Sequence, residues 1–202
     1  MAAQLRKPSG WFGSLVLSRI MNRVNRGVID STIDLLRVSP DHQVLEIGFG
    51  GGSALVQLAK RLTSGSVTGV DSSADMVLQA ERKFRRDIAA GRVQVQAGDV
   101  SQLPFADSSF DRVFTINTIY FWPDALQGLS EIRRVLKPGG IAAVSLRSKQ
   151  KMKKHRVTQY GFRLFSPEDV TALIRQAGFH DVMLEHRNQD HWYDDVIVLG
   201  TK

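Results

Sequence analysis

The stretch Val44–Ser53, VLEIGFGGGS, joins a short apolar run to a loop of glycines and then to a helical pattern. Glycine lets a chain turn sharply and lets a ligand approach the backbone, while the first turn of a helix offers unpaired N–H groups. Gly48, Gly50 and Gly52 form GxGxG, whereas the dinucleotide fingerprint GxGxxG needs its third glycine at the position of Ser53. The loop therefore predicts a ligand site and disfavours a nicotinamide dinucleotide.

A carboxylate stands at the end of the next apolar run, VTGVD. Asp71 lies 19 residues after Gly52, at the tip of a predicted second strand, where an acid can accept hydrogen bonds from both hydroxyls of a ribose. The structural alternative is that Asp71 only caps the helix that begins near Ser73. The glycine loop before it favours the ribose role.

Short runs of β-branched residues alternate with helical patterns from Gln43 onward, which is typical of an open, mostly parallel sheet covered by helices. The last two strands are joined by HRNQDH, which is too short for a crossover helix, so that pair is expected to be antiparallel. Ser166 and Pro167 predict a helix start. We place strands at 43–48, 66–71, 92–97, 111–117, 140–147, 179–186 and 192–200, and helices at 52–62, 73–89, 124–135 and 167–176. The sequence therefore predicts an α/β fold.

The composition limits the class of protein. A chain of 202 residues with 43% hydrophobic and 23% charged residues is long enough for one well-buried core. Cysteine is absent, which excludes disulfides and thiolate metal sites. No apolar run approaches the roughly 18 residues of a membrane span, and no small-residue cleavage site follows the apolar stretch that ends by Arg19. These features predict a soluble cytoplasmic protein.

The net charge of +7 is unevenly distributed. Residues 1–29 hold five basic residues and no acid, residues 132–167 hold ten and no acid, and the rest of the chain holds 12 basic residues and all 20 acids. Two positive segments on an acidic body favour an anionic partner. Residues 11–38 carry the apolar stripe of one or two amphipathic helices. We therefore expect a helical N-terminal segment over 1–40, followed by a folded domain over 41–202 that carries the glycine loop.

Four ordered motifs extend the pattern beyond the glycine loop. VLEIGFGGG, VTGVDSSADM, VQAGDVSQLPFADSSFD and LKPGG, in this order and spacing, resemble the motifs of class I S-adenosylmethionine-dependent methyltransferases. The likeness covers about residues 40–200 and is strongest to the methyltransferase type 11 group, which includes quinone-biosynthesis enzymes. It implies a Rossmann-like seven-stranded sheet with helices on both faces, with S-adenosyl-L-methionine as cofactor and S-adenosyl-L-homocysteine as product.

The resemblance assigns roles around the first strand ends. Glu46 and the backbone of Gly48–Gly52 would hold the methionine part of the cofactor, and Asp71 would bind the ribose hydroxyls. Asn117, by its backbone carbonyl or its side chain, would stand by the cofactor's ammonium. Phe49 departs from the family pattern, because many relatives carry a small or polar residue there. Its ring is expected either to pack beneath the loop or to narrow the pocket.

The resemblance also assigns the adenine contacts. Ser72 and Met76 would lie against the adenine ring. Asp99 would accept a hydrogen bond from the adenine amino group, with the Val100 N–H near the ring. The structural alternatives are a core contact for Met76 and a loop-forming turn for Asp99.

Methyl transfer from a sulfonium is an in-line displacement, so the protein's main task is to align the two reactants and exclude water. No metal is demanded, and the five histidines show no paired ligand spacing. A general base is needed only if the acceptor must lose a proton, and Tyr120, His155 and His191 are the catalytic candidates. In NTIYFWPD, residues 117–124, we expect Tyr120 or Trp122 to face the acceptor and the other rings to pack against the next helix.

In related enzymes the segment before the first strand and the insertion after the fifth strand cover the cofactor and shape the acceptor site. The resemblance therefore implies an N-terminal helical lid over 1–40 and an S-adenosylmethionine-binding domain over 41–202. The insertion of this chain is 147–165, RSKQKMKKHRVTQYGFRLF. It is expected to be a basic acceptor lid, with Tyr160 on its apolar side. Its charge would attract an anionic acceptor or one presented at a membrane surface. The alternative is that the segment is only a solvated loop.

Three functions stay open on the sequence alone. The favoured one is methyl transfer to a small-molecule or lipid-like acceptor; the others are methylation of nucleic acid or protein, and cofactor binding without transfer. Amino-group methyltransferases often carry an Asn-Pro-Pro-Tyr box at this strand end. Asn117 and Tyr120 fit its outer positions, but Thr118 and Ile119 replace both prolines. Nucleic acid is further disfavoured because the lid is short and no RNA-binding domain is appended. The oligomeric state is not predicted.

Overall fold

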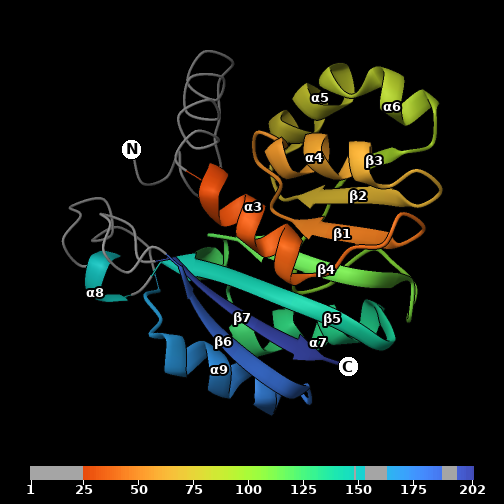
Figure 1. Cartoon of the computed structure of the whole chain (residues 1–202). Helices are drawn as coiled ribbons and strands as arrows, with labels where there is room; N and C mark the ends of the chain where they lie inside the picture. The colour runs from red at the N-terminus through yellow and green to blue at the C-terminus, as the bar shows by residue number, and fades with distance from the viewer. Residues whose placement is uncertain (1–24, 148, 153–162, 188–194) are drawn as a thin grey trace.

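The computed structural model describes residues 25–147, 149–152, 163–187 and 195–202. The strands of this part of the chain are β1 (Gln43–Ile47), β2 (Ser66–Asp71), β3 (Val93–Ala97), β4 (Phe110–Ile116), β5 (Leu136–Arg147), β6 (His180–Arg187) and β7 (Asp195–Thr201). They form one sheet in the order β3-β2-β1-β4-β5-β7-β6 (Figure 1). Strands β1 to β5 pair in parallel, whereas β7 is antiparallel to both β5 and β6. The predicted α/β fold with a C-terminal antiparallel hairpin is confirmed.

Helices cover both faces of the sheet (Figure 1). The helical elements are α3 (Arg26–Leu35), α4 (Ser53–Arg61), α5 (Ala74–Lys83), α6 (Arg85–Ala89), the 3-10 helix η1 (Ile119–Phe121), α7 (Ala125–Val135), α8 (Lys149–Met152) and α9 (Pro167–Gln176). Apolar side chains of α3, α4 and α5 pack on one face, and those of α7 and α9 on the other. Along β7, Val196 and Val198 join one cluster and Ile197 and Leu199 the other, because side chains alternate across a strand.

One predicted helix is interrupted. The helix expected over 73–89 breaks at Phe84, whose backbone angles of φ −99° and ψ 12° are not those of a regular helix. The ring of Phe84 is buried and lies against Gly52 in the glycine loop. The break therefore buries an aromatic ring that a continuous helical pattern did not reveal.

The LKPGG motif, residues 136–140, forms an irregular first part of strand β5. Strand β5 begins at Leu136, earlier than predicted, and its pairing with β4 jumps from Phe110 and Leu136 to Arg112 and Ile141. Several residues of β5 thus stand opposite a single residue of β4, which is the arrangement of a β-bulge. Gly139 has a φ of 73°, which glycine adopts without the penalty of a Cβ atom.

Helix α3 is bound to the sheet by apolar and polar contacts. Val28, Ile29 and Ile33 are buried in the core that includes β1 and β4. The hydroxyl of Thr32 lies 2.7 Å from that of Ser145 in β5, and this hydrogen bond is buried. Residues 1–24, which hold the rest of the predicted N-terminal lid, lie outside the described residues. The domain division at residue 40 stays a prediction.

The basic segment 132–167 is partly neutralised by acids of the folded body. Arg134 pairs with Glu131, and Lys137 pairs with Asp111, each at 2.8 Å. These two cations belong to α7 and β5 and are not part of the 147–165 insertion. The positive charge that could attract an anionic acceptor is therefore smaller than the sequence count suggests.

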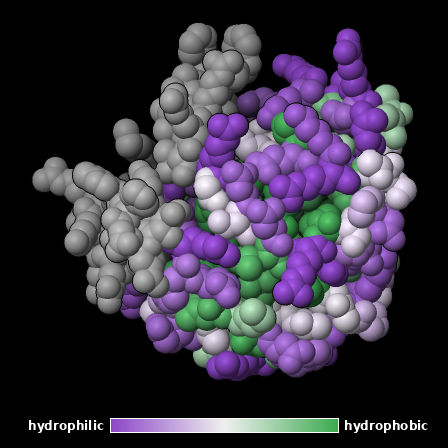
Figure 2. All heavy atoms as spheres, in the orientation of Figure 1, coloured by the Kyte–Doolittle hydropathy of each residue, from purple (hydrophilic) through white to green (hydrophobic). Residues whose placement is uncertain are grey.

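The visible surface is mostly hydrophilic. Figure 2 shows hydrophobic side chains in the middle of this face, framed by hydrophilic ones. Among the described residues, the large apolar side chains with more than a third of their area exposed are Leu78, Met183 and Leu184. Two of these lie on the edge strand β6. In the same part of the chain, no helix combines the length and the apolar character needed to cross a membrane.

Candidate functional site

Three strand ends meet at one edge of the sheet. Strand β1 pairs in parallel with β2 on one side and with β4 on the other. Glu46 near the end of β1, Asp71 at the end of β2 and Asn117 just after β4 therefore share this edge. Open α/β sheets bind ligands at the carboxyl ends of their strands. The structure brings the predicted glycine loop and these three predicted polar residues together.

The glycine loop connects β1 to α4 through left-handed backbone. Gly48, Gly50 and Gly52 have φ angles of 74°, 48° and 67°, a region that other residues disfavour. A Cβ at Gly48 would collide with Thr118 Cγ2, and a Cβ at Gly52 would lie 2.8 Å from the ring of Phe84. No atom lies within 4 Å of a Cβ built at Gly50. The loop is packed at both ends and open at its middle, which suits a ligand cradle.

Asp71 holds the glycine loop and the start of α5 together. Its Oδ2 accepts a hydrogen bond from the N–H of Gly50, and its Oδ1 accepts one from the N–H of Ser73, both at 3.0 Å. The helix-capping alternative therefore accounts for one of the two bonds. Burial raises the pKa of Asp71, and the two backbone N–H groups oppose that rise. An ionised carboxylate offers about four acceptor positions, so two remain for ribose hydroxyls.

Glu46 is a buried carboxylate that lacks a complete set of partners. Its side chain is buried, and Oε2 has no hydrogen-bond partner among the described residues. Burial, followed by the nearby charge of Asp71, raises the pKa of Glu46 well above its ordinary value, while Lys83 opposes the rise. Lys83 Nζ itself donates to the carbonyl of Gly51 at 2.7 Å. A buried acceptor without a donor is costly, so Glu46 suits a cationic donor of a bound ligand.

Phe49 packs beneath the loop, which is the first of the two expected arrangements. Its ring is buried, and a Cβ at Gly69 in β2 would lie 2.6 Å from Phe49 Cδ1. Gly69 thus provides the space for this ring. The ring of Phe49 fills the core beside β2.

Most of the residues assigned to adenine have structural roles already. Met76 is buried in the core, and Asp99 Oδ1 accepts a hydrogen bond from the Ser101 N–H at 2.8 Å, so both structural alternatives are observed. Ser72 is exposed, and Val100 is buried beside α7. The adenine contacts stay predictions.

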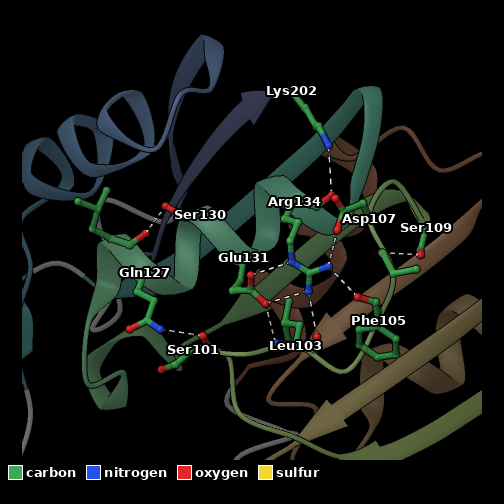
Figure 3. A network of polar contacts seen from close by, with 12 residues as sticks. Ser101, Leu103, Phe105, Asp107, Ser109, Gln127, Ser130, Glu131, Arg134 and Lys202 are labelled. Atoms are coloured by element: carbon green, nitrogen blue, oxygen red, sulfur yellow. Dashed lines mark hydrogen bonds and ion pairs between the residues drawn. The ribbon is translucent and has the colours of Figure 1, made fainter.

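A polar network fixes the segment after β3 to α7 (Figure 3). The Arg134 guanidinium donates to the carbonyls of Leu103 and Phe105 at 3.0 and 2.8 Å. It also pairs with Glu131 and Asp107, both at 2.8 Å. Glu131 Oε2 in turn accepts from the Leu103 N–H at 2.8 Å. The LPFADSSFD part of the third motif is therefore held in place by side chains of one helix face.

Tyr120 and Trp122 are both largely buried, at 3% and 7% exposure. The indole ring lies against Gly128 of α7, where a Cβ would stand 2.8 Å from Trp122 Cε3. Its Nε1 donates to Thr118 Oγ1 at 3.2 Å. The Tyr120 hydroxyl accepts from the Arg147 N–H at 2.5 Å. The expected packing of a ring on the next helix is found for Trp122, and acceptor contacts of both rings stay predictions.

Asn117 is held at both ends of its side-chain amide. Its Nδ2 donates to Asn25 Oδ1, and its Oδ1 accepts from the Tyr120 hydroxyl, both at 3.2 Å. The Asn117 N–H donates to the Ser145 carbonyl at 2.8 Å. Arg147 Nη2 donates to the same Asn25 Oδ1 at 2.9 Å. Because the side chain bonds within the protein, the backbone carbonyl of Asn117 is the better candidate for a ligand contact.

Some predicted residues lie outside the described part of the chain, namely His155, Tyr160 and His191. Within the described part, no group of three or more His, Cys, Asp or Glu side chains could hold a metal ion. Sequence reasoning missed Asn25 and Lys83 at this site. Asn25 gave the usual signal of a helix cap, yet its side chain makes no capping bond.

Comparison with known proteins gives the family. Residues 44–140 match the methyltransferase domain family, and this span includes the glycine loop, Asp71, Asp99 and Asn117. The chain is 35% identical over 126 residues to the ubiquinone/menaquinone biosynthesis C-methyltransferase UbiE of Geotalea daltonii. The chain belongs to the class I S-adenosylmethionine-dependent methyltransferases. The match to the Geotalea enzyme covers 59% of this chain and about half, 54%, of that protein.

Two other proteins match over a greater length. An uncharacterized methyltransferase of Bacillus subtilis is 26% identical over 175 residues, which cover 86% of this chain and 91% of that protein. A chain in the complex between the Haloferax volcanii Trm112 methyltransferase activator and a methyltransferase aligns with a TM-score of 0.79 at 22% identity. That alignment covers 91% of this chain and 92% of the other. The structural likeness shows that the two chains share a fold.

Proposed function

We propose that this methyltransferase transfers a methyl group to a small-molecule or lipid-like acceptor. When bound, S-adenosylmethionine supplies a methyl group on a sulfonium, which the acceptor atom attacks opposite the sulfur as the sulfur–methyl bond breaks. The observation that carries the cofactor assignment is the buried Glu46 Oε2, which has no hydrogen-bond partner in the described part of the chain and lies next to the glycine loop that Asp71 holds.

The residues at this edge would divide the cofactor among them. Glu46 and the loop backbone would hold the methionine part, and the Asn117 carbonyl would stand by its ammonium. Asp71 would accept from the ribose hydroxyls with the positions left beside its two backbone bonds. The adenine ring would meet Ser72, Met76, Asp99 and Val100. These residues are all assigned to cofactor contacts. If the acceptor must lose a proton, a group on the acceptor side would therefore take it.

The acceptor side is proposed from the surroundings of Tyr120. The Arg147 N–H donates to the Tyr120 hydroxyl at 2.5 Å, and the Arg163 N–H donates to the Tyr120 carbonyl at 3.1 Å. The two described ends of the 147–165 insertion thus both contact one residue beside Asn117. This supports the proposal that the insertion shapes the acceptor site. Tyr120, Trp122 and the insertion would form its wall.

Two observations support this acceptor class over a nucleic acid or a protein amine. The Geotalea relative is named for ubiquinone and menaquinone biosynthesis. The amide of Asn117 is bonded to Tyr120 and Asn25, so it is already occupied and does not stand free to hold a planar amine. A ring-bearing acceptor between apolar walls fits both observations.

The test is to incubate the protein with cell extract and methyl-labelled S-adenosylmethionine, and to separate lipid, small-molecule, protein and nucleic-acid fractions. We expect S-adenosylhomocysteine to form and label to enter the lipid or small-molecule fraction. Label in protein or nucleic acid would support the second function. Binding of S-adenosylmethionine without any S-adenosylhomocysteine would support a protein that only binds the cofactor. The Asp71→Ala variant serves as the control for label that does not come from this site.

A further inference from the structure

Four residues close a ring of hydrogen bonds at the end of β4. The Arg147 N–H donates to the Tyr120 hydroxyl at 2.5 Å, and this hydroxyl lies 3.2 Å from Asn117 Oδ1. Asn117 Nδ2 donates to Asn25 Oδ1 at 3.2 Å, and Arg147 Nη2 donates to the same oxygen at 2.9 Å. The ring therefore joins the residue before α3, the loop after β4, the helix η1 and the end of β5.

Asn25 takes part in this ring in place of its usual role. It occupies the position before α3 where an asparagine side chain normally accepts from the first backbone N–H groups of the helix. Its side chain makes no such bond. About two helical turns later, the Thr32 hydroxyl lies 2.7 Å from that of Ser145, two residues before Arg147 in β5. Helix α3 is thus attached to β5 at two points, and the first of them includes Asn117.

The Tyr120 hydroxyl is held as a neutral group. Burial raises its pKa, and the adjacent Arg147 N–H only partly opposes that rise. The hydroxyl also lies 3.3 Å from the Arg147 carbonyl, so its single proton can go to that carbonyl or to Asn117. Arg147 Nε in turn lies 3.7 Å from Asp195 Oδ1. A hydroxyl in these surroundings acts as a hydrogen-bond donor and acceptor and is poorly suited to accept a proton.

We infer that Asn25, Tyr120 and Arg147 are positioning residues that fix the Asn117 peptide for the amino-acid end of the cofactor. Asn117 has a φ of 58°, in the left-handed region that few residues other than glycine adopt. The next residue, Thr118, packs against Gly48, so this peptide lies beside the glycine loop. The ring keeps the peptide in that conformation and aims its carbonyl at the ammonium. This inference rests on the proposed function.

The test compares two ligands, one with and one without the amino-acid end. Calorimetry with S-adenosylhomocysteine and with methylthioadenosine, which lacks the amino-acid end, measures the contribution of that end. We expect Asn25→Leu and Tyr120→Phe to raise the dissociation constant of S-adenosylhomocysteine about tenfold, and to leave that of methylthioadenosine within about twofold. Asn25→Asp keeps an oxygen that can accept from both donors and should behave like the wild type. Asp34→Ala, an exposed change on the same helix, is the matched control.

The outcomes separate the ring from the proposed function. An equal loss for both ligands would mean a general loss of structure, and unchanged affinity for S-adenosylhomocysteine would mean that the ring positions nothing; either result overturns the inference. A wild-type protein that binds neither ligand overturns the proposed function itself. Once the acceptor is known, loss of one limb of the pH–rate profile in Tyr120→Phe, with affinity intact, would make Tyr120 a general base and also overturn the inference.

Discussion

The carboxylate of Asp71 accepts a hydrogen bond from the N–H of Gly50 at 3.0 Å, so the end of β2 holds the glycine loop that follows β1. The other oxygen of the same carboxylate binds the N–H of Ser73 at the start of α5. One side chain thus joins the first two strand ends before any ligand binds. A substitution of Asp71 therefore acts on the loop and on the ribose contact together.

Asp71→Ala is expected to weaken binding of S-adenosylmethionine tenfold or more, measured by calorimetry. A tenfold change corresponds to about 1.4 kcal/mol, and a charged contact to two hydroxyls exceeds that. Asp75→Ala is the control, because it removes an exposed acid from the first turn of α5, the helix that follows Asp71, and does not touch the glycine loop. Equal affinities of the Asp71 variant and the wild type would contradict the ribose assignment.

Glu46 makes the stability of the cofactor-free protein depend on pH. Its folded-state pKa lies above the ordinary value of 4.5, so between these two values the folded protein binds more protons than the unfolded chain. The free energy of unfolding therefore falls as pH rises through that window. Glu46→Gln stays neutral, so it should be more stable than the wild type at about pH 8, with a smaller difference at about pH 4. Urea unfolding at both pH values checks this, and a difference that shrinks with rising pH would contradict it.

The fold could be predicted where its signals are local. The helix start predicted at Ser166 and Pro167 is found in α9, where Ser166 and Asp169 form a capping box with bonds of 3.2 and 2.8 Å. The short HRNQDH connection required an antiparallel hairpin, and the structure contains it. The break at Phe84 could not be predicted, because the space for its ring is provided by Gly52, which is distant in sequence.

The site could be predicted in part for a related reason. Parallel strands place their carboxyl ends at one edge of the sheet, so the sequence predicts that Glu46, Asp71 and Asn117 lie close together there. The bond between Asn25 and Arg147 joins residues 122 positions apart, and no local pattern marks such a pair. In the same way, the burial of Trp122 depends on Gly128 in the neighbouring helix. Long-range polar partners and close packing had to be seen in three dimensions.

Arg134→Ala is expected to lower the free energy of unfolding by about 2 kcal/mol or more, measured by urea unfolding. The change leaves the carbonyls of Leu103 and Phe105 and the carboxylate of Glu131 without this donor. The matched control is Arg133→Ala, since Arg133 donates an exposed hydrogen bond to the Gly178 carbonyl. Its effect should stay within about 0.5 kcal/mol. Similar losses in the two variants would show that the network contributes little.

Gly48→Ala should lower the free energy of unfolding more than Gly139→Ala does, although the two glycines have nearly equal φ angles of 74° and 73°. Either change places a Cβ in the left-handed region, at about 1–2 kcal/mol. The Cβ at position 48 also collides with Thr118 Cγ2, whereas the Cβ at position 139 meets no atom within 4 Å. Overpacking should therefore add about 1–3 kcal/mol to the destabilisation at position 48. Thr118→Ser removes that methyl and keeps the hydroxyl that accepts from Trp122 Nε1. In a double-mutant cycle, Thr118→Ser should therefore bring Gly48→Ala close to Gly139→Ala in urea unfolding. If the serine gave no recovery, the close contact between the glycine loop and the residue after Asn117 would not be what limits position 48.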